Sequence, residues 1–283
     1  MNNKISIFGS SGFVGNHYLN MFLDNCIPIE REDDNPKSND VLYFISTVHN
    51  YNIFENPYLD VNTNLLKLIK VLECFKNTTS NGVFNFISSW FVYGKNCTLN
   101  TKESDICDPT GFYSITKRAA EQMLICYCNT FNLNYRILRL TNIIGPGDVG
   151  CSVKKNAVQF MITELCHNKP IKVYDNGSNI RDFMDVTDAC RAINVCIKKA
   201  PPNEIINISN RQPKSIGDII LNVKNKTQST SNIEYISAPK FHKIVQVKDV
   251  CLNNDKLLSY GYTPSINTDE SVENIIKSVR NTL

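Results

Sequence analysis

Apolar residues recur along the first half of the chain in two alternating patterns. Short apolar runs typical of buried strands occupy residues 4–8, 27–30, 41–45, 83–88 and 135–141. Between these runs, apolar positions three and four residues apart predict helices after residue 12 and at 58–75 and 113–131. Because strand and helix alternate throughout, we predict a parallel sheet wrapped by helices on both faces.

The order of elements becomes less regular after Asn142. The pattern predicts helices at 155–166, 186–199, 215–226 and 269–280, and a strand at 171–174. The expected fold is therefore α/β: a Rossmann-type doubly wound parallel sheet with a smaller, partly discontinuous α/β substrate lobe. We assign residues 1–142 plus 183–204 to the sheet domain and 143–182 plus 205–283 to the smaller lobe, with the 186–199 helix packing back on the sheet.

Composition narrows the possible partners and the compartment. Hydrophobic residues make up 42% and charged residues 20%, with a net charge of +3, which argues for no nucleic-acid and no membrane partner. No apolar run is long enough to span a membrane. The eleven cysteines form no CxxC pair, so we expect reduced thiols in a cytoplasmic protein, and we predict no metal site.

A glycine-rich turn follows the first predicted strand. Gly9, Gly12 and Gly15 form a GxxGxxG pattern between this strand and the helix after it. Glycines at such a junction allow a tight turn and close approach to a pyrophosphate, which the amino terminus of the helix attracts. The position of the pattern predicts dinucleotide binding.

The end of the second strand normally selects the cofactor. An acidic residue there binds the ribose hydroxyls of NAD, whereas a nearby arginine accepts the 2′-phosphate of NADP. The chain offers Glu30 and Arg31 in succession, within a charged cluster that could equally be solvated. We favour NADP through Arg31 and keep NAD as the alternative.

The candidate catalytic residues are a tyrosine and a lysine four positions apart. Tyr113 and Lys117 share one face of the predicted 113–131 helix. We expect Lys117 to lower the pKa of the phenol so that Tyr113 exchanges a proton with a sugar oxygen or ketone. Ser88 and Ser89 end the fourth strand at the ligand-binding edge of such sheets, and Ser89 could share the proton or simply cap the next turn.

Together these residues make the chain resemble the extended short-chain dehydrogenase/reductases, in the group of nucleotide-sugar epimerases, dehydratases and reductases. The resemblance covers nearly the whole chain in the order of the family, through the segments GSSGFVG, ISSWFVYG, YSITK, RLTNIIGPGD, NGSNIRDFMDV and VQVKDVCLNNDKL. It implies an NAD(P)-dependent enzyme acting on a nucleotide-diphosphate sugar, with Ser89, Tyr113 and Lys117 as the catalytic group.

The resemblance also implies binding roles, position by position. Cofactor-binding residues would be Gly9, Ser11, Gly12, Phe13, Val14, Gly15, Glu30, Arg31, Ile45, Ser46, Thr47, Ser88, Tyr113, Lys117 and Thr141. Substrate-binding residues would be Trp90, Asn142, Arg181, Lys243 and Gln246. Arg181 could instead form a salt bridge with Asp182 or Asp185, and His242 is a rival of Lys243.

Two departures from the family pattern restrict the reaction. The 4,6-dehydratases of the family carry Asp-Glu directly after the catalytic hydroxyl residue, where this chain has Trp90 and Phe91, so a dehydratase is not expected. The segment before Val41 is too short for another aspartate-bearing strand, which would weaken cofactor retention. We therefore expect a reductase of a 4-keto (6-deoxy) sugar nucleotide, with a 4-epimerase as the alternative and a non-catalytic NAD(P) sensor as a third possibility.

The family resemblance implies a homodimer that pairs the helices at 58–75 and 113–131. The second helix carries an unbroken apolar run from Met123 to Cys128, so some of these side chains must point away from the sheet. The alternative is that the smaller lobe or a loop covers them.

Overall fold

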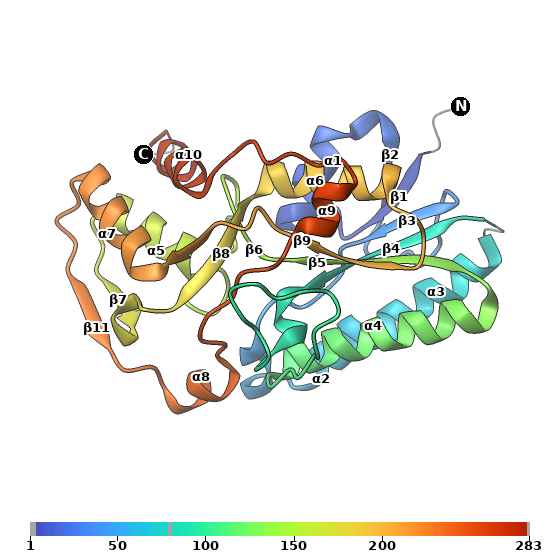
Figure 1. Cartoon of the computed structure of the whole chain (residues 1–283), viewed down its shortest axis with the longest axis horizontal. Helices are drawn as coiled ribbons and strands as arrows, with labels where there is room; N and C mark the ends of the chain where they lie inside the picture. Colours follow the sequence, from blue (N-terminus) through green and yellow to red (C-terminus); the bar gives the residue numbers. More distant parts are fainter. Residues whose placement is uncertain (1–3, 79–80, 282–283) are drawn as a thin grey trace.

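The computed structural model describes residues 4–78 and 81–281. A six-stranded parallel sheet forms its centre, in the order β2-β1-β3-β4-β5-β9 (Figure 1). Its strands are β1 (Ile5–Phe8), β2 (Cys26–Ile29), β3 (Asp40–Tyr43), β4 (Val83–Ser89), β5 (Asn134–Leu140) and β9 (Glu204–Ile208). The alternating pattern of the sequence therefore predicted the parallel sheet and five of its strands correctly, whereas β9 was not predicted.

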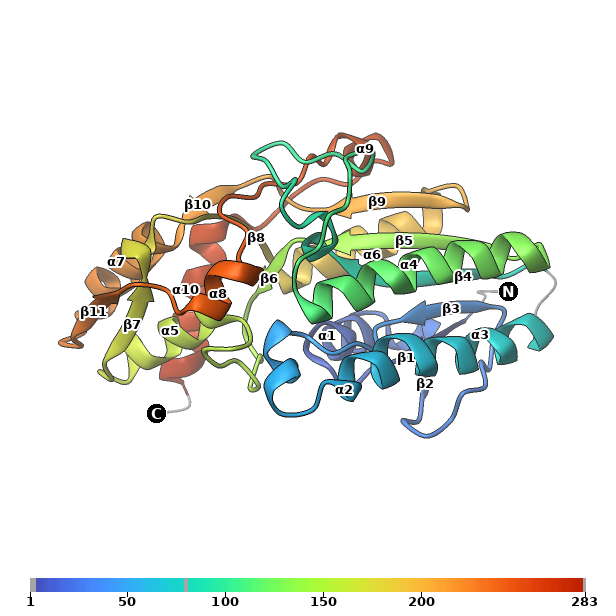
Figure 2. The ribbon, with the colours of Figure 1, turned by 90° about the horizontal axis from the view of Figure 1, so that it is seen from below.

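Helices cover both faces of this sheet, as the two views show (Figure 1, Figure 2). α1 (Phe13–Met21) and α6 (Val186–Lys199) pack on one face, where Tyr18 and Ile193 join a core with Leu138. α3 (Lys67–Thr78) and α4 (Phe112–Phe131) pack on the other. The prediction that the 186–199 helix packs back on the sheet is confirmed.

The sheet lacks the outer strand that a dinucleotide-binding fold often has beyond its second strand. Residues 30–39 lie between β2 and β3 without forming a strand, and all of them are described. β2 is consequently an edge strand. The expectation that the segment before Val41 forms no further strand is confirmed, and weak cofactor retention stays a prediction.

The catalytic helix α4 has well-defined ends. Gly111 is its N-cap, and Ser114 Oγ accepts a hydrogen bond from the Gly111 amide at 3.0 Å. A Cβ atom on Gly111 would lie 2.1 Å from Asn50 Oδ1, so the close approach of Asn50 requires glycine. Asn132, in the left-handed conformation with φ 53°, ends the helix.

The helix predicted at 58–75 is not uniform. It consists of α2 (Tyr58–Val61), a π-helical turn (Asn62–Leu66) and α3. The wider turn interrupts the 3.6-residue spacing that apolar periodicity assumes, and such turns are frequent at functional sites. It carries Asn64, whose side chain faces the site described below.

The smaller lobe contains short sheets and peripheral helices (Figure 1). Its strands are β6 (Asn142–Ile144), β7 (Ile171–Tyr174), β8 (Ile180–Asp185), β10 (Pro213–Ser215) and β11 (Ile233–Ile236). Its helices are α5 (Ala157–Cys166), α7 (Ile216–Thr227), α8 (Lys240–Val245) and α10 (Thr268–Arg280), while the short α9 (Asp255–Ser259) lies beside β9. The predicted boundary at residue 204 needs correction, because residues 205–208 continue β9 of the large sheet.

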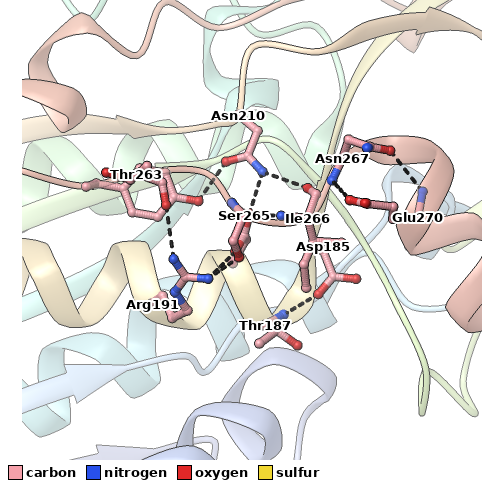
Figure 3. A network of polar contacts seen from close by, with 11 residues as sticks. Asp185, Thr187, Arg191, Asn210, Thr263, Ser265, Ile266, Asn267 and Glu270 are labelled. Atoms are coloured by element: carbon pink, nitrogen blue, oxygen red, sulfur yellow. Dashed lines mark hydrogen bonds and ion pairs between the residues drawn. The ribbon is translucent and has the colours of Figure 1, made fainter.

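The C-terminal segment is anchored to α6 through a buried carboxylate, Asp188. Asp188 accepts hydrogen bonds from the amides of Ser265 and Ile266, at 2.9 and 3.0 Å, and from Asn210 Nδ2 at 2.9 Å. Figure 3 shows Arg191 reaching the same segment, where it donates to the Thr263 carbonyl at 3.0 Å. This network fixes the segment that leads into α10 against α6, while α10 itself packs on α5 and β8 of the smaller lobe.

All eleven cysteines are free thiols; five are buried and Cys126 is exposed. Among the described residues, no helix combines the length and the apolar character that crossing a membrane would require.

Replacement of Asp188 by asparagine is expected to lower the free energy of unfolding by about 3 kcal/mol. The amide has one acceptor oxygen, and its NH₂ group would face backbone donors. Urea unfolding measures the change, with the exposed Asp255→Asn as a control that should stay within about 0.5 kcal/mol of the wild type. An Asp188→Asn variant as stable as the control would contradict this role.

The same carboxylate predicts an acid limit of stability. Burial raises the pKa of Asp188, but the hydrogen bonds from Ser265, Ile266 and Asn210 outweigh burial and hold it below the usual value. This contribution is therefore present above the unfolded-state pKa, and it disappears as the pH falls through the lower folded-state pKa.

Candidate functional site

The glycine loop forms a cradle at the amino terminus of α1. Gly9 has φ +79°, and the Gly12 amide donates to the Gly9 carbonyl at 3.2 Å. A Cβ atom on Gly15 would lie 2.4 Å from that carbonyl oxygen, so only glycine allows the helix to approach the strand this closely. No side chain caps the first turn of α1, which leaves its amides free to bind an anionic group.

A cavity of about 320 Å³ extends from this loop to the catalytic helix. It brings together the following predicted residues: Gly9, Gly12, Phe13, Val14, Gly15, Ser46, Thr47, Ser88, Ser89, Trp90, Tyr113, Lys117, Thr141 and Asn142. The glycine cradle and the elongated lining fit a dinucleotide cofactor, with Gly9, Gly12 and Gly15 against the pyrophosphate and Lys117 farther along the cavity.

Four predicted cofactor residues do not line this cavity. Ser11, Glu30 and Arg31 are exposed, and Ile45 packs its side chain into the apolar core. The carbonyl of Arg31 accepts a hydrogen bond from Lys67 Nζ at 3.0 Å, which holds the backbone after β2 against the 58–78 helix. A role for Glu30 or Arg31 in choosing between NAD and NADP stays a prediction.

Tyr113, Ser89 and Ser46 place three hydroxyl groups together. Ser89 ends β4, Tyr113 lies in the first turn of α4, and Ser46 follows β3. Both serine hydroxyls act on the Tyr113 phenol and oppose the rise of its pKa. Ser89 Oγ also accepts from the Phe91 amide at 3.3 Å, so it caps the following turn as well as meeting the tyrosine.

The predicted electrostatic effect of Lys117 on Tyr113 is wrong in this structure. Burial raises the pKa of Tyr113 to about 12, and the groups that oppose this rise are Ser89 and Ser46. Lys117 donates to the Ile87 carbonyl at 2.7 Å and lies 4.1 Å from the centre of the Phe86 ring. Burial also lowers the pKa of Lys117 to about 7, so its ammonium is only partly charged near neutral pH.

A buried network of polar side chains holds Ser46 in position. Asn64 Oδ1 accepts from Ser46 Oγ at 3.1 Å and from the Thr47 amide at 2.9 Å. Asn64 Nδ2 donates to Thr116 Oγ1 at 2.9 Å, one turn along α4 from Tyr113. Thr47 Oγ1 donates to the fully buried Asp60. The network thus joins the end of β3, the π turn and the catalytic helix.

Ser88 faces a second buried group. Its hydroxyl donates to Glu121 Oε1 at 2.6 Å, and Arg139 holds the same carboxylate through two hydrogen bonds of 3.0 and 2.8 Å. Glu121 and Arg139 are both essentially inaccessible to solvent. Ser88 is therefore tied to a structural ion pair on α4, which fixes the helix against β4 and β5. Sequence analysis assigned no role to Glu121, although its spacing of two helical turns from Tyr113 could have indicated one.

A larger cavity of about 590 Å³ adjoins the first one. The two cavities share Val48, Trp90, Phe91, Asn142 and Asn156. Of the predicted substrate residues, Trp90, Asn142, Arg181 and Gln246 line the larger cavity. The prediction that Lys243 binds the substrate needs correction, because Lys243 is exposed on α8 and does not line the cavity. His242, the alternative to Lys243, lines the cavity instead.

Arg181 brings an unpaired positive charge to the larger cavity. Its guanidinium donates to the carbonyls of Ile180, Val247 and Lys248 and lies 5.6 Å from the Trp90 ring centre. In the described part of the chain, no carboxylate lies within ion-pair distance of it. The alternative of a salt bridge is thus wrong.

The two aspartates proposed for that salt bridge have other partners. Asp182 accepts from the Gln212 and Leu252 amides, and Asp185 caps α6 through the Thr187 amide. The charge of Arg181 therefore remains available to an anionic ligand. Burial lowers the pKa of Arg181 only to about 10, so the guanidinium stays charged at neutral pH.

Trp90 and Phe91 form an apolar wall beside the hydroxyl cluster. Their rings stack with centroids 4.0 Å apart, and the Phe91 ring lies edge-on to Tyr113 at 6.0 Å. No acid or base therefore stands at the two positions after Ser89. The site can exchange a proton through Tyr113 and hold an anionic ligand at Arg181.

Comparisons with known proteins agree with this geometry. Residues 33–209 match the family described as NAD dependent epimerase/dehydratase. The chain is 22% identical to a putative UDP-glucose 4-epimerase from Methanocaldococcus jannaschii, with 98% of each chain covered.

Solved structures of two enzymes have the same fold. A Bacillus cereus UDP-glucuronic acid 4-epimerase, in complex with UDP-glucuronic acid and NAD, superimposes with a TM-score of 0.89 at 19% identity, over 99% of this chain and all of that one. RMD from Pseudomonas aeruginosa, complexed with NADPH, superimposes with a TM-score of 0.87 at 21% identity and the same coverage. The chain therefore belongs to the NAD dependent epimerase/dehydratase family, within the extended short-chain dehydrogenase/reductases that act on nucleotide sugars.

Proposed function

We propose that the protein is a nucleotide-sugar 4-epimerase, the alternative that sequence analysis placed second. The observation that carries this proposal is the cavity of about 590 Å³ next to the hydroxyl cluster. Inverting a carbon by removing and returning its hydrogen requires the keto sugar to present both faces to one cofactor. Val48, Trp90 and Phe91 give the junction of the cavities an apolar lining, on which a sugar ring can turn.

Similarity supports the same reaction. The putative UDP-glucose 4-epimerase from Methanocaldococcus jannaschii matches along nearly its whole length, and the structure from Bacillus cereus contains UDP-glucuronic acid and NAD. We therefore propose a nucleotide-diphosphate sugar as the substrate, with Arg181 holding the diphosphate and Gln246 and His242 near the nucleoside.

Proton transfer in both half-reactions is assigned to Tyr113. It accepts the proton of the sugar hydroxyl as the carbon is oxidised and returns it when the carbon is reduced again. Ser89, whose hydroxyl proton is free to donate, stabilises the phenolate between these steps, and Ser46 is the second hydroxyl that lowers the pKa of the phenol. A bound NAD(P) supplies reversible hydride exchange, and the glycine cradle and Lys117 are the residues that would hold it.

A reductase of a 4-keto sugar nucleotide is the second candidate. The favouring observation is the exposed end of β2, where Glu30 and Arg31 lie outside the cavity and no outer strand covers the adenine side. A reductase must exchange its cofactor in every turnover, and the RMD structure contains NADPH.

Protein purified without added cofactor is expected to carry NAD, because an epimerase must retain it through both half-reactions. The nucleotide released on denaturation is identified by chromatography. An empty protein that binds NADPH on titration would overturn the epimerase in favour of the reductase.

Tyr113→Phe is expected to lower turnover by about a hundred- to ten-thousand-fold, since it removes the group that moves the proton. Cofactor binding and thermal stability should stay close to wild type. Tyr127→Phe, on the same helix but away from the cavity, is the matched control and should retain turnover. A Tyr113→Phe variant as active as this control would exclude the proposed acid–base role.

We propose a homodimer built on α3 and α4, which lie side by side on the outside of the large sheet (Figure 2). Leu66, in the π turn that precedes α3, and Ile115 on α4 are 50% and 47% exposed. In the predicted apolar run from Met123 to Cys128 only Cys126 is exposed, whereas Leu124 and Cys128 are buried against the sheet. A two-fold contact would bury Leu66 and Ile115 on each copy.

Light scattering should give a mass of twice 32.1 kDa for the wild type. Leu66→Glu should shift the protein toward the monomer, because it places a charge in the apolar contact. A monomeric wild type at micromolar concentration would refute the dimer.

A further inference from the structure

The cofactor cavity is lined by a lysine, Lys155, that has no role in the proposed reaction. Of the residues that line it, only Lys117, Asp148 and Lys155 are charged. The Lys117 amino group is buried against the Ile87 carbonyl and the Phe86 ring. Lys155, which comes from the smaller lobe, keeps 28% of its side chain accessible. It is therefore the cation of this cavity that a ligand can approach.

The segment that carries Lys155 lies against α1. A Cβ atom on Gly147 would be 3.3 Å from His17 Cε1, and the His17 ring is held by the Phe13 carbonyl at 2.9 Å in the first turns of this helix. The 145–156 segment thus crosses the helix whose amino terminus forms the glycine cradle. Lys155 and Gly12 line the same cavity from opposite lobes.

The ammonium of Lys155 is positioned before any ligand binds. Lys155 Nζ lies 3.2 Å from Asp148 Oδ1, and Asn156 Nδ2 donates to Asp148 Oδ2 at 3.0 Å. Backbone hydrogen bonds of 2.7 and 3.1 Å join Ser152 and Lys155. Because an ammonium has three donors and Asp148 is its one carboxylate partner in the described chain, donors remain for a further anion.

We propose that Lys155 is a cofactor ligand, and that it clamps the pyrophosphate of NAD(P) onto the glycine cradle from the side of the smaller lobe. The cradle itself supplies backbone amides and the partial positive charge of a helix terminus, about half an elementary charge. A pyrophosphate carries two negative charges, which exceed this partial positive charge, and the ammonium of Lys155 adds one full positive charge. Asp148 positions the lysine, and the lysine in turn neutralises this buried carboxylate.

The neighbouring lysine provides a matched control. Lys154 lines the larger cavity rather than the cofactor cavity, and it pairs with Glu55 at 2.6 Å on the surface. Neutralising Lys154 removes the same charge from the adjacent residue without touching the proposed pyrophosphate contact.

The test is a binding measurement that uses no nucleotide sugar, so its outcome is independent of the proposed epimerase reaction. Dissociation constants for NADH and ADP-ribose are measured for Lys155→Met, Lys155→Gln and Lys154→Met. We expect both ligands to bind about tenfold more weakly to each Lys155 variant, because one charge-assisted contact is lost. Lys154→Met should stay within about twofold of the wild type. Thermal unfolding verifies that each variant is folded.

Three results would overturn the proposal, two in the single variants and one in a double variant. Unchanged affinity in the folded Lys155 variants would leave Lys155 as a structural partner of Asp148, and a loss for NADH without a loss for ADP-ribose would move the contact to the nicotinamide. The double variant Asp148→Asn/Lys155→Met separates loss of the lysine–pyrophosphate contact from repulsion of the pyrophosphate by an unpaired Asp148. Persistent weak binding in it supports the clamp, whereas recovery to wild-type affinity would show that Lys155 only neutralises the aspartate.

Discussion

Burial of the Tyr113 phenol at the carboxyl edge of the sheet is the constraint on which the rest of the site depends. Burial disfavours the phenolate that proton transfer requires, and it raises the pKa of Tyr113 to about 12. The neighbouring lysine is buried as well and has a pKa near 7, so it cannot act as a permanent positive charge at neutral pH. The groups that oppose the rise in the pKa of Tyr113 and favour the phenolate are the hydroxyls of Ser89 and Ser46.

The need to hold these hydroxyls beside Tyr113 explains the buried hydrogen-bond network next to the cavity. The Ser46 oxygen can lie beside Tyr113 only if the backbone after β3 is fixed, and Asn64 fixes it by accepting from the Ser46 hydroxyl and the Thr47 amide. The π turn at 62–66 brings Asn64 to this position, and Thr116 ties the same amide to the catalytic helix. On the other face of α4, the Glu121–Arg139 ion pair holds the helix against the sheet. The catalytic oxygen is thus positioned by partners from four segments.

The sequence predicted the features that depend on local pattern. Apolar periodicity located α4 and the first five strands of the large sheet, but not β9, and the spacing of Gly9, Gly12 and Gly15 predicted the cradle. Features that depend on the packing of distant segments were not predictable in this way. The pKa of Tyr113 depends on burial, the choice of His242 over Lys243 depends on how α8 turns, and Lys155 meets the cavity only because its segment crosses α1. No short-range signal marks these positions.

In the proposed reaction, hydrogen at the sugar carbon moves as hydride inside the site, while Tyr113 moves only the hydroxyl proton. Turnover of a UDP sugar in deuterium oxide, with the product analysed by NMR, tests this most directly. We expect an inverted carbon 4 that contains no deuterium from the solvent. Deuterium at that carbon would show that the carbon itself exchanges a proton with the solvent, and it would contradict the assignment of Tyr113, Ser89 and Ser46 to an oxidation–reduction at the sugar.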